Sequence, residues 1–125
     1  MTIARQRTGR RAEELVAARL ARQGWSIVDR NARTRFGEID IVAGDGRTLV
    51  FVEVKAARTG HGPFSERPEL AVGGQKQRRL RRLAAAWLAG SHLRPGFDQV
   101  RFDVVAVGYG HRGEVVRYVH IQDAF

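Results

Sequence analysis

Three charged residues stand inside two apolar segments of the sequence, where an ordinary strand would carry Val or Thr. Asp40 lies in the segment 37–43, and the Glu53-Val54-Lys55 tripeptide ends the segment 49–55. Burying a charged side chain is costly unless it is paired or bound to a cation. We therefore expect a divalent metal site here; the alternative is a structural ion pair that Lys55 forms with Glu53 or Asp40.

The turn between the two segments predicts how the carboxylates lie relative to each other. Asp45-Gly46 is typical of a two-residue hairpin turn, which would place Phe51 opposite Asp40. Asp40 and Glu53 would then be diagonal neighbours on one face, about 7 Å apart at the backbone, with Lys55 on the same face. The opposite face would carry apolar residues of the core, namely Ile39, Ile41, Val50, Val52 and Val54.

Carboxylates that converge in this way repel each other unless a cation lies between them. Two charges about 4 Å apart repel by roughly 4 kcal/mol at an effective dielectric constant of about 20. Oxygen ligands favour Mg²⁺ or Mn²⁺ over Zn²⁺, and the chain has no cysteine. We expect Asp40 and Glu53 to hold one such ion. Lys55 would polarise the attacking water or stabilise charge that develops on a phosphate.

A third acidic residue is expected from the first helix, residues 9–23. At about 100° per residue, Glu13 borders the apolar stripe of this helix and Glu14 points away from it. Glu13 therefore either meets the sheet near the two carboxylates or remains a boundary residue at the surface. Glu38 shares the face of Asp40 and is an accessory candidate, or else a charge that flanks the hairpin.

The pattern of apolar residues predicts two helices and five strands in one α/β domain. The expected helices are 9–23 and 75–89, and the expected strands are 25–28, 37–43, 48–56, 99–107 and 114–121. Thr8 would cap the first helix, and Gly24 would end it. The order α-β-β-β-α-β-β predicts a central mixed sheet flanked by helices. Residues 1–8 would form a flexible basic arm, and residues 57–74 a long mobile loop.

Length and composition are typical of one small globular domain. The chain has 125 residues, enough for a single domain and too few for two. It has no cysteine and no apolar run of membrane-spanning length, so we expect a cytoplasmic protein with no membrane partner. The net charge of +9 and the pI of about 11.4 indicate a polyanionic partner such as DNA; generic basicity of an Arg-rich chain is the alternative.

The basic residues are clustered along the sequence. Residues 1–35 contain nine Arg against three acidic residues, and five of the seven residues 76–82 are basic. Cationic side chains near a helix N-terminus can hold phosphate together with free backbone N–H groups, although they can also form a solvated helix face. The candidates for nucleic-acid binding are Arg10, Arg11, Arg33, Arg35, Lys76, Arg78, Arg79 and Arg82.

Asp40, followed after a hairpin by Glu53-Val54-Lys55, resembles the motif of the PD-(D/E)xK nucleases. Ile39 takes the place of the proline in that motif. A closer resemblance, to the YraN-like family of predicted endonucleases, is carried by residues 37–42, 50–55, 101–105 and 120–125 together. One departure is Arg58, which stands one place later than the Arg of the EVKxR motif common in that family, so its role stays open.

This resemblance covers nearly the whole chain and implies a restriction-endonuclease-like fold similar to that of archaeal Holliday-junction resolvases. Asp40, Glu53 and Lys55 match the catalytic residues. Glu13 matches the glutamate of the first helix, and Val54 would add its backbone carbonyl to the metal ligands. The function implied is a Mg²⁺- or Mn²⁺-dependent endonuclease of duplex or branched DNA, with a homodimer required for symmetric cleavage of a junction. The alternative is a non-catalytic nucleic-acid-binding protein that keeps the nuclease fold.

Overall fold

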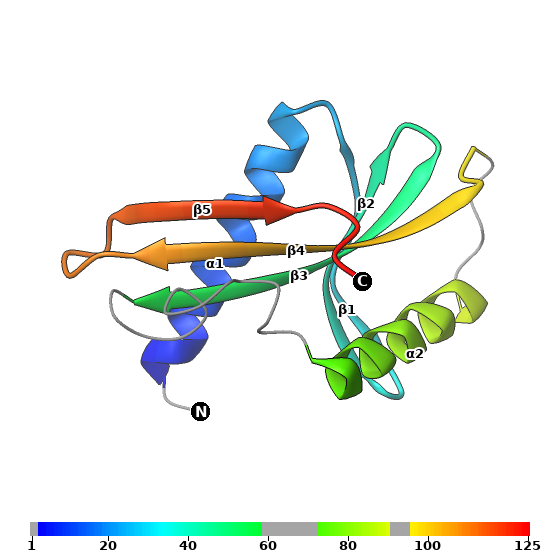
Figure 1. Cartoon of the computed structure of the whole chain (residues 1–125), viewed down its shortest axis with the longest axis horizontal. Helices are drawn as coiled ribbons and strands as arrows, with labels where there is room; N and C mark the ends of the chain where they lie inside the picture. The colour runs from blue at the N-terminus through cyan, green and yellow to red at the C-terminus, as the bar shows by residue number, and fades with distance from the viewer. Residues whose placement is uncertain (1–2, 59–72, 91–95) are drawn as a thin grey trace.

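Two helices and five strands make up the part of the chain that the computed structural model describes, which is residues 3–58, 73–90 and 96–125. The elements are α1 (Ile3–Arg22), β1 (Ser26–Thr34), β2 (Gly37–Asp45), β3 (Thr48–Arg58), α2 (Gly74–Gly90), β4 (Gln99–Tyr109) and β5 (Val115–Ile121) (Figure 1). Their order is the one that the sequence predicts. The expected α/β class is therefore confirmed.

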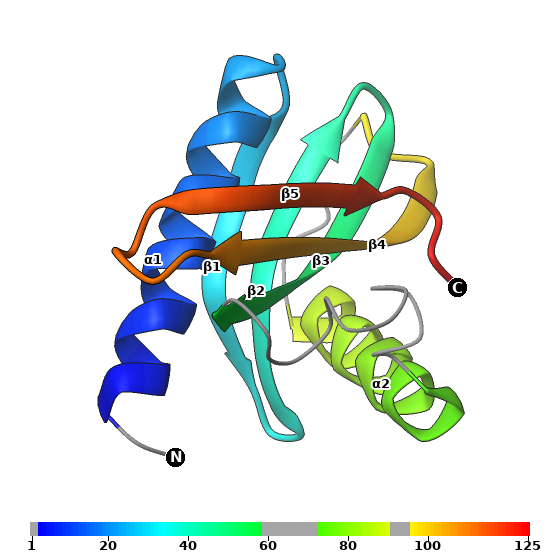
Figure 2. The ribbon, with the colours of Figure 1, turned by 60° about the vertical axis from the view of Figure 1, so that its left-hand side comes forward.

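The five strands form one mixed sheet in the order β1-β2-β3-β4-β5. Strands β3 and β4 are parallel, and the other neighbouring pairs are antiparallel. Parallel neighbours need a crossover connection, and α2 lies in the segment between them. Figure 2 shows α1 on one side of the sheet and α2 on the other. The sheet is twisted, so β4 and β5 run across the direction of β1 and β2.

Each face of the sheet has its own hydrophobic core. The α1 face contains Ala12, Val16, Ala17, Leu20, Trp25, Ile41, Ala43, Val50, Val52, Val105, Val107 and Tyr109. The α2 face contains Ala32, Ile39, Val42, Leu49, Phe51, Leu80, Leu83, Ala84, Phe102 and Val104. The expectation that Ile39 and Ile41 share one face is wrong, because Ile39 packs under α2 and Ile41 packs under α1. The central strands are therefore apolar on both sides, as strands with a parallel neighbour usually are.

The first helix is longer than its apolar pattern indicates. α1 begins at Ile3, so Thr8 lies inside the helix and does not cap it, and the helix includes residues 3–8 of the expected basic arm. Gly24 ends the helix as expected: its φ is 94°, and the backbone N–H of Trp25 returns to the carbonyl of Leu20. Residues 59–72, most of the expected loop, lie outside the described residues. Neither α1 nor α2 offers an apolar stretch long enough to cross a bilayer within the described ranges.

Strand β1 also extends further than expected, to Thr34 instead of Val28. The added residues are mostly polar, and all but one of residues 30–34 are exposed or half-buried. β1 is an edge strand, with β2 as its neighbour in the sheet. A strand at an edge needs little apolar sequence, because side chains on its outer face meet water. The hydrophobic pattern could therefore not mark the second half of β1.

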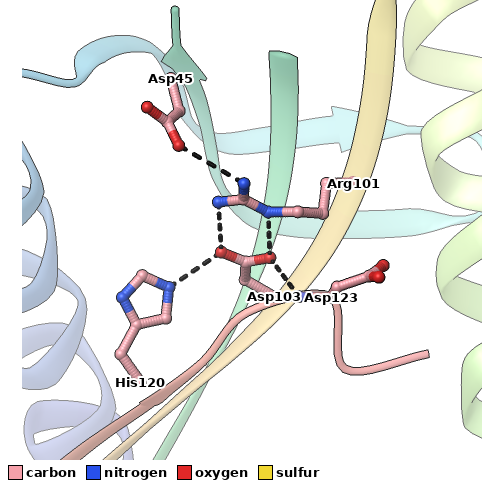
Figure 3. Close-up of polar contacts among 5 residues, drawn as sticks. All are labelled: Asp45, Arg101, Asp103, His120 and Asp123. Atoms are coloured by element: carbon pink, nitrogen blue, oxygen red, sulfur yellow. Dashed lines mark hydrogen bonds and ion pairs between the residues drawn. The ribbon is translucent and has the colours of Figure 1, made fainter.

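A fully buried carboxylate joins β4 to the C-terminal segment (Figure 3). Asp103 accepts hydrogen bonds from Nε and Nη2 of Arg101 at 2.8 and 3.0 Å, from Nε2 of His120 at 2.8 Å and from the backbone N–H of Asp123 at 3.0 Å. Arg101 also reaches Asp45 at 3.4 Å. Burial by itself would raise the pKa of Asp103, but these hydrogen bonds keep it below its usual value. Both carboxylate oxygens of Asp103 are thus engaged by hydrogen bonds within the protein, which fits a structural role.

Candidate active site

The β2–β3 hairpin places Asp40 and Glu53 at the point where two strands separate. The ladder runs from the pair Asp45–Thr48 to the pair Ile41–Val52, so Asp40 and Glu53 come next on the two strands. Beyond that pair, β2 continues against β1, whereas β3 continues against β4. The two carboxylates therefore stand at a fork in the sheet.

The turn of this hairpin is one position later than expected. Gly46 and Arg47 connect the pair Asp45–Thr48, whereas Asp45-Gly46 was expected at the tip. Each residue of β2 consequently faces a partner two positions further along β3, so the residue paired with Val42 is Phe51. Asp40 and Glu53 are thus nearly opposite each other across the two strands, whereas a diagonal arrangement was predicted. A change of two residues in register by itself keeps each side chain on its face, because side chains alternate with a period of two. The alternation is nevertheless broken at Asp40, since Ile39 packs under α2 and Ile41 packs under α1.

Asp40 is a largely buried carboxyl group with acidic neighbours. Burial contributes most to raising its pKa from 3.8 to about 8, followed by the charge of Glu53, and the charge of Glu13 adds to the effect. A 2.8 Å hydrogen bond from the backbone N–H of Val54 to Oδ2 and the charge of Lys55 act in the opposite direction. Asp40 is therefore protonated near neutral pH unless a cation balances the three carboxylates.

The hydrogen bond from Val54 also orients its peptide carbonyl. In a β-strand, the N–H and C=O groups of one residue point toward the same neighbouring strand. Because the N–H of Val54 points at Asp40, strand geometry turns the carbonyl of Val54 to the same side. Two side-chain carboxylates and one backbone oxygen thus face the fork, as the expected ligand set requires.

Glu53 and Lys55 form a short ion pair beside Asp40. Nζ of Lys55 lies 3.1 Å from Oε1 of Glu53, and the two side chains are only 16% and 14% exposed. The ion pair that the sequence left as an alternative is therefore present. It also holds the ammonium group next to both carboxylates, as a catalytic lysine must be held. This pair fits a structural role and a catalytic one equally.

Glu13 reaches the site from α1, and its partner was not foreseen. Nδ2 of Asn31 donates a 2.6 Å hydrogen bond to Oε2 of Glu13. Asn31 lies between the pairs Arg30–Ile41 and Ala32–Ile39, and so across from Asp40 in the sheet. Its φ of 48° is left-handed, a conformation that asparagine tolerates better than most residues. The contact between Asn31 and Glu13 depends on this backbone conformation, which a sequence pattern does not reveal.

Two acidic residues near the motif lie away from the fork. Glu38, the accessory candidate, is exposed and stands opposite Arg33 of β1. Glu14 is exposed on α1, as its position relative to the apolar stripe predicts, whereas Glu13 is half-buried. Glu38 therefore fits the alternative reading, a charge that flanks a hairpin.

Lys76, expected to contact phosphate, lies beside Lys55. A hydrogen bond to Lys55 is the main cause that lowers the pKa of Lys76, followed by burial and by the charge of Lys55, and Glu53 opposes these effects. Lys76 stands in the first turn of α2, which begins at Gly74. The start of α2 therefore brings a second amine to the edge of the fork, which the sequence motif did not indicate.

The oxygen donors at the fork suit Mg²⁺ better than a metal that needs a complete protein cage. Among the residues that the structure describes, no three His, Asp or Glu side chains form a group that could enclose a metal ion by themselves. Mg²⁺ usually keeps several waters and binds through one or two carboxylates. Asp40 and Glu53, with the carbonyl of Val54, meet that requirement, and the repulsion that raises the pKa of Asp40 is relieved by a cation.

Most of the expected phosphate-binding residues gather around α2. Arg33, Arg35 and Arg82 line a cavity of about 930 Å³ between the β1–β2 hairpin and α2. A second cavity, of about 760 Å³, is lined by Lys76, Arg78, Arg79 and Arg82. Because Arg82 borders both cavities, the two form one basic band along α2 that starts next to Lys55.

The two candidates on α1 lie apart from this band. Arg10 is exposed. Arg11 donates a 3.2 Å hydrogen bond to the carbonyl of Gly113 and stacks on the ring of Tyr109 at 5.0 Å. Arg11 and Arg58 line a smaller cavity of about 170 Å³ at the β4–β5 turn. Arg11 is thus engaged by Gly113 and Tyr109, away from the candidates around α2.

Comparisons with other proteins identify the family. The model of the "Uncharacterised protein family UPF0102" matches residues 12–107. The UPF0102 protein of Rhodococcus jostii is 47% identical over 120 residues, which are 94% of each chain. The UPF0102 protein of Geobacter sulfurreducens is 48% identical over 120 residues, 94% of this chain and 87% of the relative. That of Streptomyces griseus is 49% identical over 113 residues, 90% and 92% of the two chains. The chain therefore belongs to the UPF0102 family, the YraN-like family that its motifs resemble.

Proposed function

We propose that this protein is a Mg²⁺-dependent DNA endonuclease that hydrolyses phosphodiester bonds. The observation that carries the proposal is the fork between β2 and β3. Asp40 lies next to Glu53 there, the Lys55 ammonium group is 3.1 Å from Glu53, and a basic band begins at the same edge. Metal-assisted phosphodiester hydrolysis needs three parts, namely acidic metal ligands, a positioned ammonium or guanidinium group and a surface that binds a polyanion.

The residues of the fork would have separate roles. When bound, Mg²⁺ would supply a Lewis acid that polarises a phosphoryl oxygen. Asp40 and Glu53 would hold the ion, together with the carbonyl of Val54. Lys55 stabilises negative charge on the phosphate as it develops, because its ammonium group is held in place by Glu53 before the substrate arrives.

Glu13 and Asn31 act on the opposite side of Asp40. The carboxylate of Glu13 is close enough to raise the pKa of Asp40, so it adds negative charge to the site. The 2.6 Å hydrogen bond from Asn31 fixes the direction of that carboxylate. Glu13 is therefore placed to orient a water molecule of the site by hydrogen bonding, with Asn31 as its positioning residue.

The basic band defines how DNA would approach. Its arginines and Lys76 follow α2 away from Lys55, so a DNA backbone held by them leads one phosphate into the fork. These side chains contact phosphates without reading bases, which favours recognition of DNA shape. The resemblance to Holliday-junction resolvases supports branched DNA as the preferred substrate, and two copies would be needed for symmetric cleavage.

A second candidate function is DNA binding without hydrolysis. The Glu53–Lys55 ion pair is compatible with it, because a largely buried pair of this kind forms without metal. The basic band would serve such a protein equally well. The two functions differ only in what happens when Mg²⁺ is supplied.

Cleavage of labelled DNA tests the proposal. Wild-type protein is mixed with branched, single-stranded and duplex DNA in Mg²⁺, Mn²⁺ or EDTA, alongside Asp40→Asn and the matched control Glu14→Gln, which alters an exposed acid of α1. We expect metal-dependent products from wild type and from Glu14→Gln, and none from Asp40→Asn. Equal product formation by wild type and Asp40→Asn would exclude the proposed site, and binding without any product would favour the second function.

A further inference from the structure

An aromatic side chain is presented to solvent at the turn between β1 and β2. Phe36 is 41% exposed and is one of the few large apolar residues that are exposed in the described part of the chain. The turn that carries it is tightly bonded. The hydroxyl group of Thr34 donates a 3.0 Å hydrogen bond to the carbonyl of Gly37, and its Oγ1 accepts a 3.1 Å hydrogen bond from the backbone N–H of Phe36. The φ of 137° at Gly37 is one that side-chain-bearing residues rarely adopt. Phe36 is therefore held outward by a defined turn.

Positive charge surrounds this ring. The guanidinium group of Arg35 lies 4.8 Å from the centroid of the Phe36 ring, and that of Arg82 lies 5.5 Å from it. Arg82 comes from α2, so the turn and the helix meet at Phe36. Both guanidinium groups lie over the ring, and nucleic-acid bases stack on aromatic rings and on guanidinium planes while the positive charge neutralises their phosphates.

The ring stands at the wall of a cavity large enough for a nucleotide. The cavity of about 930 Å³ lies between the β1–β2 hairpin and α2 and is lined by Phe36, Trp87 and small residues of α2, with Arg33, Arg35 and Arg82 at its borders. Asp29, the acidic residue among the described residues that line it, already accepts hydrogen bonds from Nε1 of Trp87 at 3.0 Å and from the backbone N–H of Arg30 at 2.9 Å. The charge that remains facing a ligand is positive.

We propose that this cavity binds an unpaired nucleotide of DNA, with its base stacked on Phe36 and its flanking phosphates held by Arg33, Arg35 and Arg82. The inference depends on the DNA-binding part of the proposed function and not on its metal chemistry. Phe36 precedes Asp40 by four residues, roughly 13 Å along an extended strand. The site therefore lies close to the fork, at the turn that leads into β2.

The proposal specifies a class of substrate. A base inside a duplex is stacked on both faces and cannot reach Phe36 without unstacking, which costs a few kcal/mol. A base in a single strand or at a branch point is already free. The cavity would therefore favour DNA that carries unpaired bases over blunt duplex, independently of base identity, since every base offers a face for stacking.

Binding measured without metal separates this inference from catalysis. In EDTA, we compare wild type, Phe36→Ala, Phe36→Leu, Phe36→Trp and the matched control Val116→Ala, which shortens an apolar residue that is 60% exposed on β5. The ligands are an oligothymidine, a forked duplex and a blunt duplex. We expect Phe36→Ala and Phe36→Leu to weaken oligothymidine and fork binding by about tenfold, with duplex binding and the thermal midpoint unchanged. Phe36→Trp and Val116→Ala should bind as wild type.

Photocrosslinking gives a direct reading of stacking. Single-stranded DNA with 5-iodouracil is irradiated with the protein in EDTA, and the adduct is mapped by mass spectrometry. We expect the adduct on Phe36. The inference is overturned if Phe36→Ala and Phe36→Leu bind single strands as wild type does, if they lose duplex affinity equally, or if the adduct lies only elsewhere. A wild type that shows the expected binding but no cleavage would refute the proposed nuclease and leave this site intact.

Discussion

Asn31 of β1 donates a 2.6 Å hydrogen bond to Glu13 of α1, and this contact ties the helix to the strand directly beside Asp40. The left-handed backbone of Asn31 suits glycine as well. Asn31→Gly should therefore keep the fold and remove only the amide, whereas Asn31→Asp adds a fourth acid. We expect each change to reduce Mg²⁺-dependent cleavage by about 10–100-fold, the usual cost of losing a group that orients an active-site residue.

The control for this prediction is Arg30→Ala, which alters the exposed neighbour of Asn31 in the same strand. Steady-state cleavage and Mg²⁺ titrations of all three variants give the comparison. If Asn31→Gly cleaves DNA and binds Mg²⁺ as wild type does, Asn31 has no positioning role for Glu13.

The raised pKa of Asp40 makes stability depend on pH. In the folded chain the pKa is about 8, against 3.8 ordinarily, so between about pH 4 and pH 8 the folded state holds one proton more than the unfolded state. Stability must then fall as pH rises, by at most about 1.4 kcal/mol per pH unit. Urea unfolding of metal-free protein in EDTA at several pH values measures this slope.

Asp40→Asn should flatten that slope, because the amide does not titrate, and should be more stable than wild type at pH 8. Mg²⁺ is expected to act in the other direction on wild type. Binding the ion releases the proton, so stabilisation by Mg²⁺ should grow between pH 6 and pH 8. The same slope for Asp40→Asn and wild type would place the titrating group elsewhere.

Lys76 contacts Lys55 from the start of α2, so its loss should affect chemistry as well as binding. We expect Lys76→Met to lower kcat for cleavage by about tenfold, in the range typical of positioning residues, in addition to the loss of duplex affinity that removing one phosphate contact of the band causes. Arg78→Met changes an exposed residue two positions further along α2 and should leave kcat nearly unchanged. An unaltered kcat in Lys76→Met would show that the contact with Lys55 has no catalytic role.

The basic band predicts a steep salt dependence of DNA binding. If the band engages about five phosphates, the slope of log affinity against log salt on duplex DNA is about −4.5. Arg79→Gln should reduce the size of that slope by about 0.9. Arg47→Gln, at the β2–β3 turn and 70% exposed, should not. Fluorescence anisotropy from 50 to 300 mM salt measures this slope. A wild-type affinity that does not change with salt would contradict the role of the basic band in DNA binding.

The Asp103 network should support stability without taking part in metal binding. Asp103→Ala leaves Arg101 without its buried partner, which typically costs about 3–5 kcal/mol. Asp98→Ala removes an exposed pair with Arg47 and should cost less than about 1 kcal/mol. Urea unfolding gives both values. A loss below about 1 kcal/mol for Asp103→Ala would mean that the network does not anchor the C-terminal segment.

The order of elements was predictable because the central strands and both helices carry strong apolar periodicity. The same signal failed where burial is slight, as in residues 29–34 of β1. A separate signal, the local turn preference of Asp45-Gly46, placed the β2–β3 turn one position early. The pairing of Val50 with Ala43 and of Val52 with Ile41 follows from packing on both faces, which local turn preference does not include.

The candidate site was predictable to the extent that its residues interrupt apolar strands. Asp40, Glu53 and Lys55 do so, and the structure brings them together. Asn31 and the contact of Lys76 with Lys55 were not predictable. Both depend on how helices and a kinked strand pack around the fork, and neither residue type is unusual at its place in the sequence.

Mn²⁺ in crystals of the wild-type protein tests the central claim most directly, because anomalous scattering locates the ion without reference to activity. If Asp40 and Glu53 bind a divalent cation, the anomalous peak lies at the fork, roughly 2.2 Å from an oxygen of each carboxylate, and it disappears in Asp40→Asn crystals soaked in the same way. A peak elsewhere, or none at saturating Mn²⁺, would contradict the metal site and with it the proposed nuclease.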